Sequence, residues 1–394
     1  METKGDENTQ YAKHIRNILL VFLVIFAISF LKLASSILLP MVIAMFLFML
    51  LNPILNRLDG TRIPRLLSTL IVMVLVVLVS AVFIYVLFLI VNMLLSKLPY
   101  YAMRVNEIDM LISQYIAPLL GMDGAEFSII DYLDINWYTL AIQSLSSFSS
   151  SIIDLFSDWM LVFLYLLFIL LERSSFPEKI MSVLSPEKAL RVSKLSMKIN
   201  RQIAKYIFLK LMISLITGFL FYAVAILTGL DFALAWGVLA TILNFIPTIG
   251  SIIVTAGTII MAVIQFMPSW ITVLYIAVLM ISIEMIMGNI IDPKLQGVKL
   301  NISPLVILIS LAFWGYIWGL AGMFLAVPIT STLQIFMANI PSLKGIAVIL
   351  STGKIREEGR IRHGKMHENT SDDIQMPEIQ TLTRNSNTDE NQNN

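Results

Sequence analysis

The sequence contains no cysteine, and only 13% of its 394 residues are charged. The absence of cysteine excludes disulfides, thiolate nucleophiles and cysteine metal sites. Soluble domains usually carry about 25% charged residues. A chain that is 58% hydrophobic, with a mean hydropathy of +0.84, has more apolar residues than a water-soluble core can hold. The net charge of +1 excludes a broad nucleic-acid-binding face, because such a face needs a clustered basic excess.

Histidine is equally scarce. His14, His363 and His367 all lie in polar flanks, so no histidine proton relay can cross a membrane. The sequence also lacks a His-Glu-x-x-His zinc motif, a Walker-type phosphate loop and an intramembrane aspartate pair of the Gly-Asp type. These absences predict that the protein is neither an enzyme nor an ATP-driven motor, and no metal or cofactor is expected.

The sequence is instead rich in long apolar runs. A membrane-spanning helix needs about 20 apolar residues, because every backbone N–H must be satisfied within the segment. The clear runs are 18–39, 41–58, 66–95, 151–171, 206–227 and 271–290. Two shorter pairs, 234–245 with 249–265 and 302–316 with 320–337, are interrupted by glycine and proline. Each pair is either two spans or one re-entrant hairpin. The predicted class is an all-α, polytopic helical membrane protein with about eight transmembrane helices.

Loop charges predict the orientation, since lysine and arginine favour cytoplasmic loops. The loops after the second and fourth runs are basic, and the loop after the third is acidic. This pattern places both termini in the cytoplasm. The expected regions are a cytoplasmic leader (1–17), N-terminal membrane helices (18–95), an extracytoplasmic amphipathic region (96–150), a membrane helix (151–171), a basic cytoplasmic amphipathic region (172–205), a C-terminal transport core (206–340) and a disordered cytoplasmic tail (353–394).

Two connecting regions have helical periodicity. Between Tyr100 and Trp137, apolar residues recur at helical spacing from Ile108 to Leu119 and predict a short amphipathic helix outside the membrane. The inner region carries a basic stripe at intervals of three or four residues, made of Lys188, Arg191, Lys194, Lys198, Arg201 and Lys205. This spacing is typical of a helix on anionic lipid headgroups. The stripe is either a membrane-surface linker or a gating element.

Ionisable residues at membrane depth are functional candidates, because each costs on the order of 2.5–3.5 kcal/mol to insert. Glu284 is the sharpest of them, since it lies within the run 271–290 with Gly288 one turn further on and Asn289 beside it. Glu284 either binds a substrate or coupling ion or is satisfied by a neighbouring helix. Simpler interface or snorkelling roles are expected for Asp154, Asp158 and Lys32.

Breaks in the apolar segments are a second functional signal, because unwound backbone in transporters binds ions or polar solutes. Proline removes a helix hydrogen bond, and glycine permits turns or close packing. The breaks either line a transport site or serve helix packing. Trp314 and Trp318 are expected to be interfacial anchors. The predicted binding residues are Glu284, Asn289, Asn244, Pro247, Gly250, Asp292 and Asn301, and the predicted hinges are Gly288, Gly315, Gly319, Gly322 and Pro328.

Several short motifs near these breaks carry a family resemblance. They are Asn244-Phe245-Ile246-Pro247-x-Ile249-Gly250, Asn289-x-x-Asp292-Pro293-x-x-x-Gly297, Asn301-x-Ser303-Pro304 and Phe313-Trp314-Gly315-x-x-Trp318-Gly319-x-x-Gly322. In this order they resemble the autoinducer-2 exporter family of permeases, over most of the chain. The resemblance implies a bacterial membrane protein, a homo-oligomer with a pentamer as one candidate form, and export of a small solute. Thr248 departs from the pattern, since an aromatic residue is common there.

The sequence therefore predicts a secondary transporter that exports a small solute such as autoinducer-2 or a related metabolite. Some members of the family are described as autoinducer-2 exporters and others as sodium/proton antiporters. A sodium (lithium)/proton antiporter and a passive oligomeric channel or scaffold are the alternatives. The expected partners are membrane lipid, a small-molecule or cation substrate and further copies of the chain, with no nucleic acid.

Overall fold

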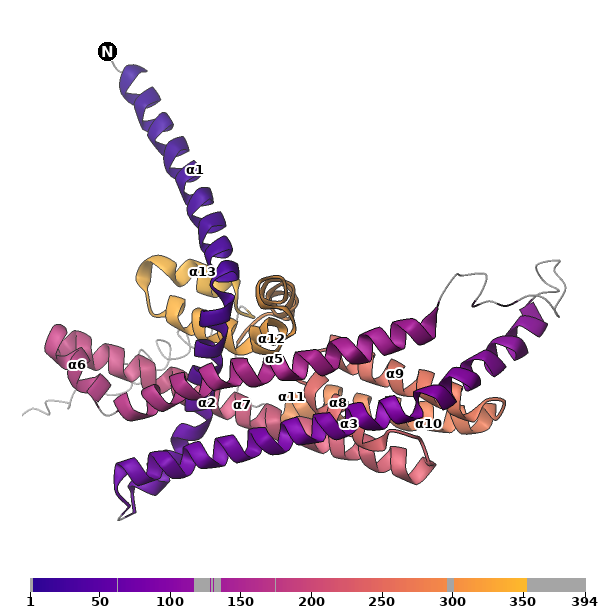
Figure 1. Ribbon diagram of the computed structural model, residues 1–394. Helices are drawn as coiled ribbons and strands as arrows, with labels where there is room; N and C mark the ends of the chain where they lie inside the picture. Colours follow the sequence, from indigo (N-terminus) through magenta and orange to yellow (C-terminus); the bar gives the residue numbers. More distant parts are fainter. Residues whose placement is uncertain are drawn as a thin grey trace, which may run out of the picture.

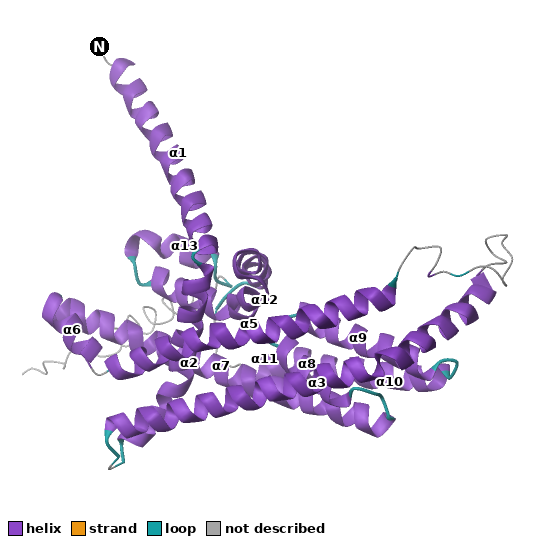
Figure 2. Ribbon diagram, viewed as in Figure 1, coloured by secondary structure: helices purple, strands orange, loops and turns teal. Residues whose placement is uncertain are grey.

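The protein is described by a computed structural model over residues 3–61, 63–116, 128, 130, 136–173, 175–295 and 301–352. Within these ranges the secondary structure is helical, apart from an isolated bridge between Ile302 and Ser351 (Figure 2). This confirms the predicted all-α class.

Figure 1 shows the order of the described helices along the chain. The N-terminal half contains α1 (Thr3–Leu33), α2 (Ser35–Asp59), α3 (Arg65–Ile116), α5 (Trp137–Glu172) and α6 (Ser175–Val183). The C-terminal half contains α7 (Pro186–Thr228), α8 (Ala233–Leu243), α9 (Ile249–Phe266), α10 (Trp270–Glu284), the π-helix η2 (Met285–Ile291), α11 (Asp292–Leu295), α12 (Pro304–Ala338), the 3₁₀-helix η3 (Pro341–Leu343) and α13 (Lys344–Ile349).

Seven helical stretches in the described ranges are long and apolar enough to cross a membrane by length and composition: α1 from His14, α2, α3, α7, α9, α10 together with η2, and α12 counted along its full length. At most 33% of the apolar window of each is buried inside the protein. Figure 1 shows α1 pointing away from the other helices, and none of its apolar window is buried. Outward-facing apolar side chains are expected where lipid is the solvent. The polytopic class is thus confirmed.

The third predicted run and the amphipathic segment after it form one continuous helix. Helix α3 is 52 residues long, or about 78 Å at 1.5 Å per residue. Pro99 lies inside α3 without ending it. Tyr101 and Ile108, in the amphipathic part, are buried. The amphipathic residues predicted as a short helix are thus helical as far as Ile116, but as the end of α3, because their packing carries that helix past the apolar run. Leu119 lies outside the described residues.

The two interrupted pairs resolve differently. Helix α8 has 11 residues, or about 16 Å, which is too short to cross a membrane. Helix α12 folds back on itself at Trp318 and Gly319, which have non-helical backbone angles. Trp314 Nε1 donates a hydrogen bond of 3.2 Å to Thr330 Oγ1 across this fold. In a straight helix those residues would lie about 24 Å apart, so α12 is a helical hairpin.

A close crossing joins α7 to α8. A Cβ atom on Gly218 of α7 would lie 2.4 Å from the backbone oxygen of Gly237 of α8. A Cβ atom on Gly237 would lie 2.9 Å from the backbone oxygen of Gly218. Only glycine permits this reciprocal backbone contact. It holds the polar side chains that precede Gly218 on α7 close to Asn244, which follows α8.

Candidate functional site

Glu284 lies where α10 ends and η2 begins. Both of its carboxylate oxygens are buried, and neither has a hydrogen-bond partner among the described residues. The groups that act on the carboxylate electrostatically are the Ser251 hydroxyl of α9 and the Lys210 ammonium of α7. Ser251 falls outside hydrogen-bonding geometry. Because π-helices are rare and often mark functional sites, this junction is the centre of the candidate site.

A buried ion pair lies close to Glu284. Lys210 Nζ is 3.2 Å from Asp292 Oδ2, and the two side chains are 4% and 19% exposed. Sequence reasoning identified Asp292 but missed Lys210, which follows closely on the basic stripe and reads as its continuation. The available signal was that Lys210 lies inside the apolar run 206–227. A lysine placed there must be paired if it stays charged.

Polar side chains of α7 form a buried row that leads to the α8–α9 turn. Tyr206, Lys210, Ser214 and Thr217 recur at intervals of four, four and three residues and therefore share one helix face. All four are buried. Ser214 Oγ accepts a hydrogen bond of 3.0 Å from Nδ2 of Asn244, which directly follows α8. Asn244 thereby joins the polar row, as a binding residue would need to.

Pro247 and Gly250 shape the turn between α8 and α9. A Cβ atom on Gly250 would lie 1.7 Å from the backbone oxygen of Leu243, so only glycine fits there. Thr248 has a φ angle of 66°. A β-branched residue is strained in this left-handed region, and such strain collects at functional sites. The turn starts α9 close beside the end of α8 and so positions Ser251 near Glu284.

Two predicted binding residues lie outside this group. Asn289 is in η2, but its side chain is exposed. The backbone oxygen of Asn301 accepts a hydrogen bond from Gln334 Nε2 at 2.8 Å, and its Oδ1 accepts one from Thr352 Oγ1 at 2.6 Å. Asn301 therefore joins α12 to the segment after α13. Gly288 does lie near the centre, since a Cβ atom there would be 4.0 Å from Glu284 Oε2.

The glycines predicted as hinges in α12 form its fold-back. Gly319 has a φ angle of 61°. A Cβ atom on Gly322 would lie 2.0 Å from the Trp314 backbone oxygen, and one on Gly315 would lie 2.8 Å from Met323 Cε. Glycine therefore lets the two arms of the hairpin pack closely. Pro328 is buried in the second arm, which remains helical around it.

The two tryptophans at this fold-back are buried, with 7% of Trp314 and 8% of Trp318 exposed. Trp318 Nε1 donates a hydrogen bond of 3.1 Å to the Leu31 backbone oxygen of α1. The expectation that they are interfacial anchors was wrong, because buried tryptophans satisfy their N–H groups inside the protein. Lys32 is exposed and lies 4.1 Å from the centre of the Tyr316 ring.

Comparison with known proteins identifies the family. The model of the AI-2E family of transporters matches residues 18–342. This chain belongs to the AI-2E family. It is 35% identical over 335 residues to a protein of Borreliella burgdorferi that is provisionally named a transport protein, covering 85% of this chain and 90% of that relative. It is 29% identical over 351 residues to the AI-2 transport protein TqsA of Escherichia coli K12, covering 86% and 96%. The protein is thus a member of a transporter family and not an enzyme.

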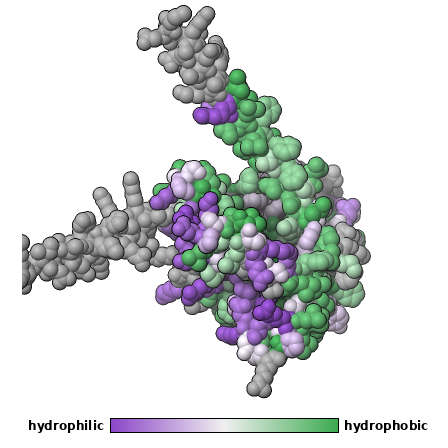
Figure 3. All heavy atoms as spheres, turned by 90° about the vertical axis from the view of Figure 1, so that its left-hand side faces the viewer, coloured by the Kyte–Doolittle hydropathy of each residue, from purple (hydrophilic) through white to green (hydrophobic). Residues whose placement is uncertain are grey.

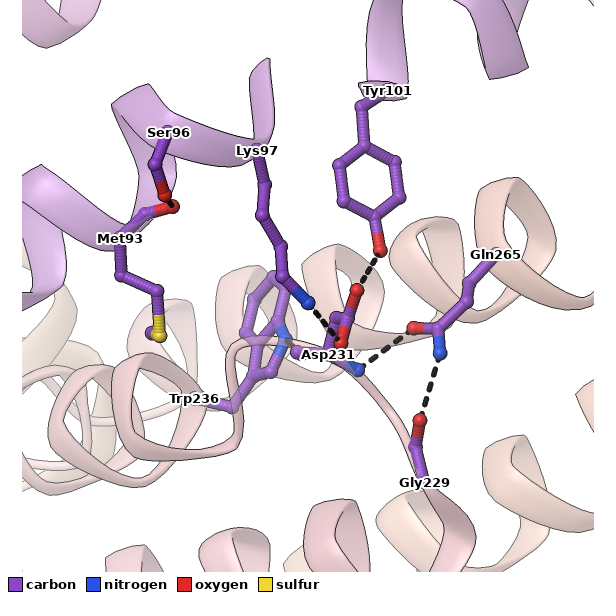
Figure 4. Close-up of polar contacts among 8 residues, drawn as sticks. All are labelled: Met93, Ser96, Lys97, Tyr101, Gly229, Asp231, Trp236 and Gln265. Atoms are coloured by element: carbon purple, nitrogen blue, oxygen red, sulfur yellow. Dashed lines mark hydrogen bonds and ion pairs between the residues drawn. The ribbon is translucent and has the colours of Figure 1, made fainter. Parts of the chain in front are cut away.

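A second polar cluster of this AI-2E chain surrounds Asp231, in the loop between α7 and α8 (Figure 4). The Asp231 carboxylate accepts a hydrogen bond of 2.5 Å from Tyr101 Oη and lies 2.6 Å from Lys97 Nζ, both on α3. Gln265 of α9 accepts from the Asp231 N–H at 2.7 Å and donates to the Gly229 backbone oxygen at 2.7 Å. The cluster fastens α3 and α9 to the α7–α8 loop.

Burial acts to raise the pKa of Asp231, but the hydrogen bonds from Lys97 and Tyr101 outweigh burial and lower that pKa below its ordinary value of 3.8. Asp231 is therefore ionised at neutral pH. Sequence reasoning missed this cluster because Tyr101 and Asp231 are 130 residues apart in the chain.

The basic stripe of the AI-2E chain is exposed along the N-terminal part of α7. Figure 3 looks onto the end of the molecule that is at the left in Figure 1 and shows hydrophilic residues gathered there beside hydrophobic flanks. A hollow beside α7 is lined by Met197, Lys198, Arg201, Gln202 and Lys205. Ile203, on the opposite side of this part of α7, is fully buried. The helix is thus amphipathic, as its spacing predicted.

Proposed function

We propose that this AI-2E protein is a secondary transporter that exports a small polar solute, such as autoinducer-2 or a related metabolite. Glu284 is the group that couples export to an ion gradient. The observation that carries the proposal is the buried Glu284 carboxylate, which has no hydrogen-bond partner among the described residues. An unpartnered carboxylate is costly in an apolar environment. A proton, a cation or a hydroxyl group of a solute would satisfy it.

The surroundings of Glu284 suit a hydroxyl-bearing solute. Ser214, Asn244 and Ser251 supply neutral hydrogen-bonding groups from three helical segments. The broken backbone after Leu243 supplies carbonyl oxygens, as interrupted helices do in other transporters. The name of the relative TqsA makes autoinducer-2 the first solute to test.

A sodium (lithium)/proton antiporter is the second candidate. The observation that favours it is the presence of two carboxylates, Glu284 and Asp292, within the electrostatic reach of a single lysine, Lys210. Carboxylates bind both protons and hard cations. In this case Glu284 would take up a proton and the transported cation in turn.

The proposal includes an orientation and an assembly. Both termini are cytoplasmic, because basic residues gather on the loops expected inside. The protein works as a homo-oligomer in the inner membrane, with residues 206–340 as the transport core. A passive oligomeric channel is the competing form, and a channel would conduct without saturation or gradient coupling.

The proposal is tested by flux into liposomes that contain the purified protein. Autoinducer-2, sodium, lithium and protons are measured together, with and without an imposed gradient. The wild type should give saturable, gradient-driven flux of one of these species. Glu284→Gln should lower that flux by roughly tenfold or more, in the range of measured coupling effects. Glu187→Gln, at an exposed carboxylate of α7, is the matched control and should leave flux unchanged. Equal flux in Glu284→Gln and wild type would refute the role of Glu284.

A further inference from the structure

We infer that Lys210 is the internal counter-cation of the transport site and that it exchanges between Asp292 and Glu284 as the protein changes state. The inference rests on the proposed function, because it takes Glu284 to be the coupling group. It adds a second residue to the site and a physical reason for the alternation between two states.

The first argument is the ratio of charges. Among the described residues, the cluster holds one lysine and two carboxylates where α7 meets the end of α10 and the start of α11. Lys210 pairs with Asp292 in this structure, while the Glu284 oxygens are buried without a partner in the described part of the chain. One ammonium group cannot neutralise both acids at once. The acid that lacks Lys210 therefore needs a proton or a cation, which is the requirement of a coupled carrier.

The second argument is the reach of the groups. The Lys210 ammonium acts on Glu284 electrostatically in the present state, although its ion pair is with Asp292. A lysine side chain has a flexible four-carbon stem and three donors that can turn toward a new acceptor. Of the other titratable groups, Tyr206 is buried on the same face of α7, and Asp292 acts on its hydroxyl group electrostatically.

The third argument is a segment that can adopt two forms. Helix η2 separates the two carboxylates, since it begins directly after Glu284 and ends directly before Asp292. A π-helix uses i→i+5 hydrogen bonds in place of the α-helical i→i+4 pattern. Conversion of η2 to an α-helix would rotate Glu284 relative to Asp292 and bring a different carboxylate to Lys210. A segment with two discrete hydrogen-bond patterns, biased by the charge at each end, is the physical basis that coupling requires.

In the resulting cycle, a proton or cation bound at Glu284 leaves Lys210 with Asp292. When that proton or cation departs, Lys210 pairs with Glu284, and η2 changes its hydrogen-bond pattern. No covalent bond forms or breaks other than the O–H bond of the transported proton. The solute site between α7, α8 and α9 changes shape with the same step, because Lys210 and Ser214 are one turn apart on α7.

The test uses the full chain in liposomes and the double variant Lys210→Met with Asp292→Asn, which removes both charges of the ion pair together. Lys344→Met, at an exposed lysine of α13 that lies outside the site and the basic stripe, is the control. Folding is followed by size-exclusion chromatography and thermal unfolding in detergent. The double variant should fold, and its gradient-driven flux should fall by roughly tenfold or more. Wild-type flux in the double variant would show that the pair only fastens η2 to α7, and would overturn the inference.

A third substitution distinguishes loss of the Lys210 exchange from a general displacement of the site residues. Adding Glu284→Gln to the double variant should cause no further loss, because the two changes disable one shared step and are non-additive. If the fold reductions in flux caused by Glu284→Gln and by the double variant multiply, the inference is overturned. If the double variant does not fold, the charge-swapped variant Lys210→Asp with Asp292→Lys is used. Flux at the wild-type level in this variant would refute the exchange of Lys210 between the two carboxylates. A folded variant without gradient-driven flux would support it. Absence of coupled flux in the wild type would refute the proposed function itself.

Discussion

Gly250→Ala is predicted to destabilise the protein more than any ordinary surface change. The added Cβ atom would lie 1.7 Å from the Leu243 backbone oxygen and 2.5 Å from its carbonyl carbon. Contacts of carbon with other heavy atoms are favourable only near 3.5–4.0 Å, so the α8–α9 turn must open by about 2 Å. Overpacking costs about 1–3 kcal/mol where side chains can move. Here the obstacle is backbone, and we expect a cost of about 3 kcal/mol or more.

The assay is thermal unfolding of the purified protein in detergent. For a chain of this size each kcal/mol lowers Tm by about 2 °C, so Gly250→Ala should lower Tm by about 6 °C or more. The control is Gly345→Ala in α13, where a Cβ atom has no neighbour within 4 Å. That change should raise stability slightly, by up to about 1 kcal/mol, because alanine favours a helix over glycine. A Tm for Gly250→Ala equal to that of Gly345→Ala would refute the close contact and the turn built on it.

Two further predictions concern buried charge. Lys210→Met should destabilise the protein by about 3–5 kcal/mol, because it removes the ammonium group that pairs with the mostly buried Asp292. Adding Asp292→Asn should recover most of the loss in Tm. A Tm that does not recover would contradict the pairing of Lys210 with Asp292. The lowered pKa of Asp231 means that its contribution to stability is complete well above pH 3.8 and is lost as pH falls through its still lower folded-state pKa. Acid unfolding below about pH 4 should therefore be shallower in Asp231→Asn than in the wild type, and parallel profiles would contradict this.

The fold was predictable from the sequence where one energetic term dominates. Apolar runs such as 206–227 and 271–290 form helices because backbone groups in lipid can be satisfied only within the segment. Beyond the ends of the apolar runs, where this requirement no longer applies, the prediction of helix ends fails. Helix α3 continues through Pro99 because its later residues pack on other helices, and that packing depends on contacts distant in sequence. The hairpin in α12 depends on the backbone of Gly319, which the sequence permits but does not require.

The candidate site was predictable in part for the same reason. Glu284 stood out because a carboxylate within a long apolar run is costly. Lys210 did not, since a lysine one turn inside a run resembles one that extends to the headgroups. Asn301 was grouped with Glu284 by motif order, but its hydrogen bonds place it against Gln334 and Thr352. Sequence proximity of motifs does not determine which helices meet.

Helix α7 connects the basic stripe to the buried ion pair without a break. One rod of 43 residues carries the six exposed cations near its start and the buried row from Tyr206 to Thr217 further along. Because the helix is continuous, a tilt imposed at its headgroup end would displace Lys210 further along. If anionic lipid binds the basic stripe, it acts on the same helix that carries the ion pair. On the proposed function, we expect the transport rate to change with the anionic lipid content of the membrane.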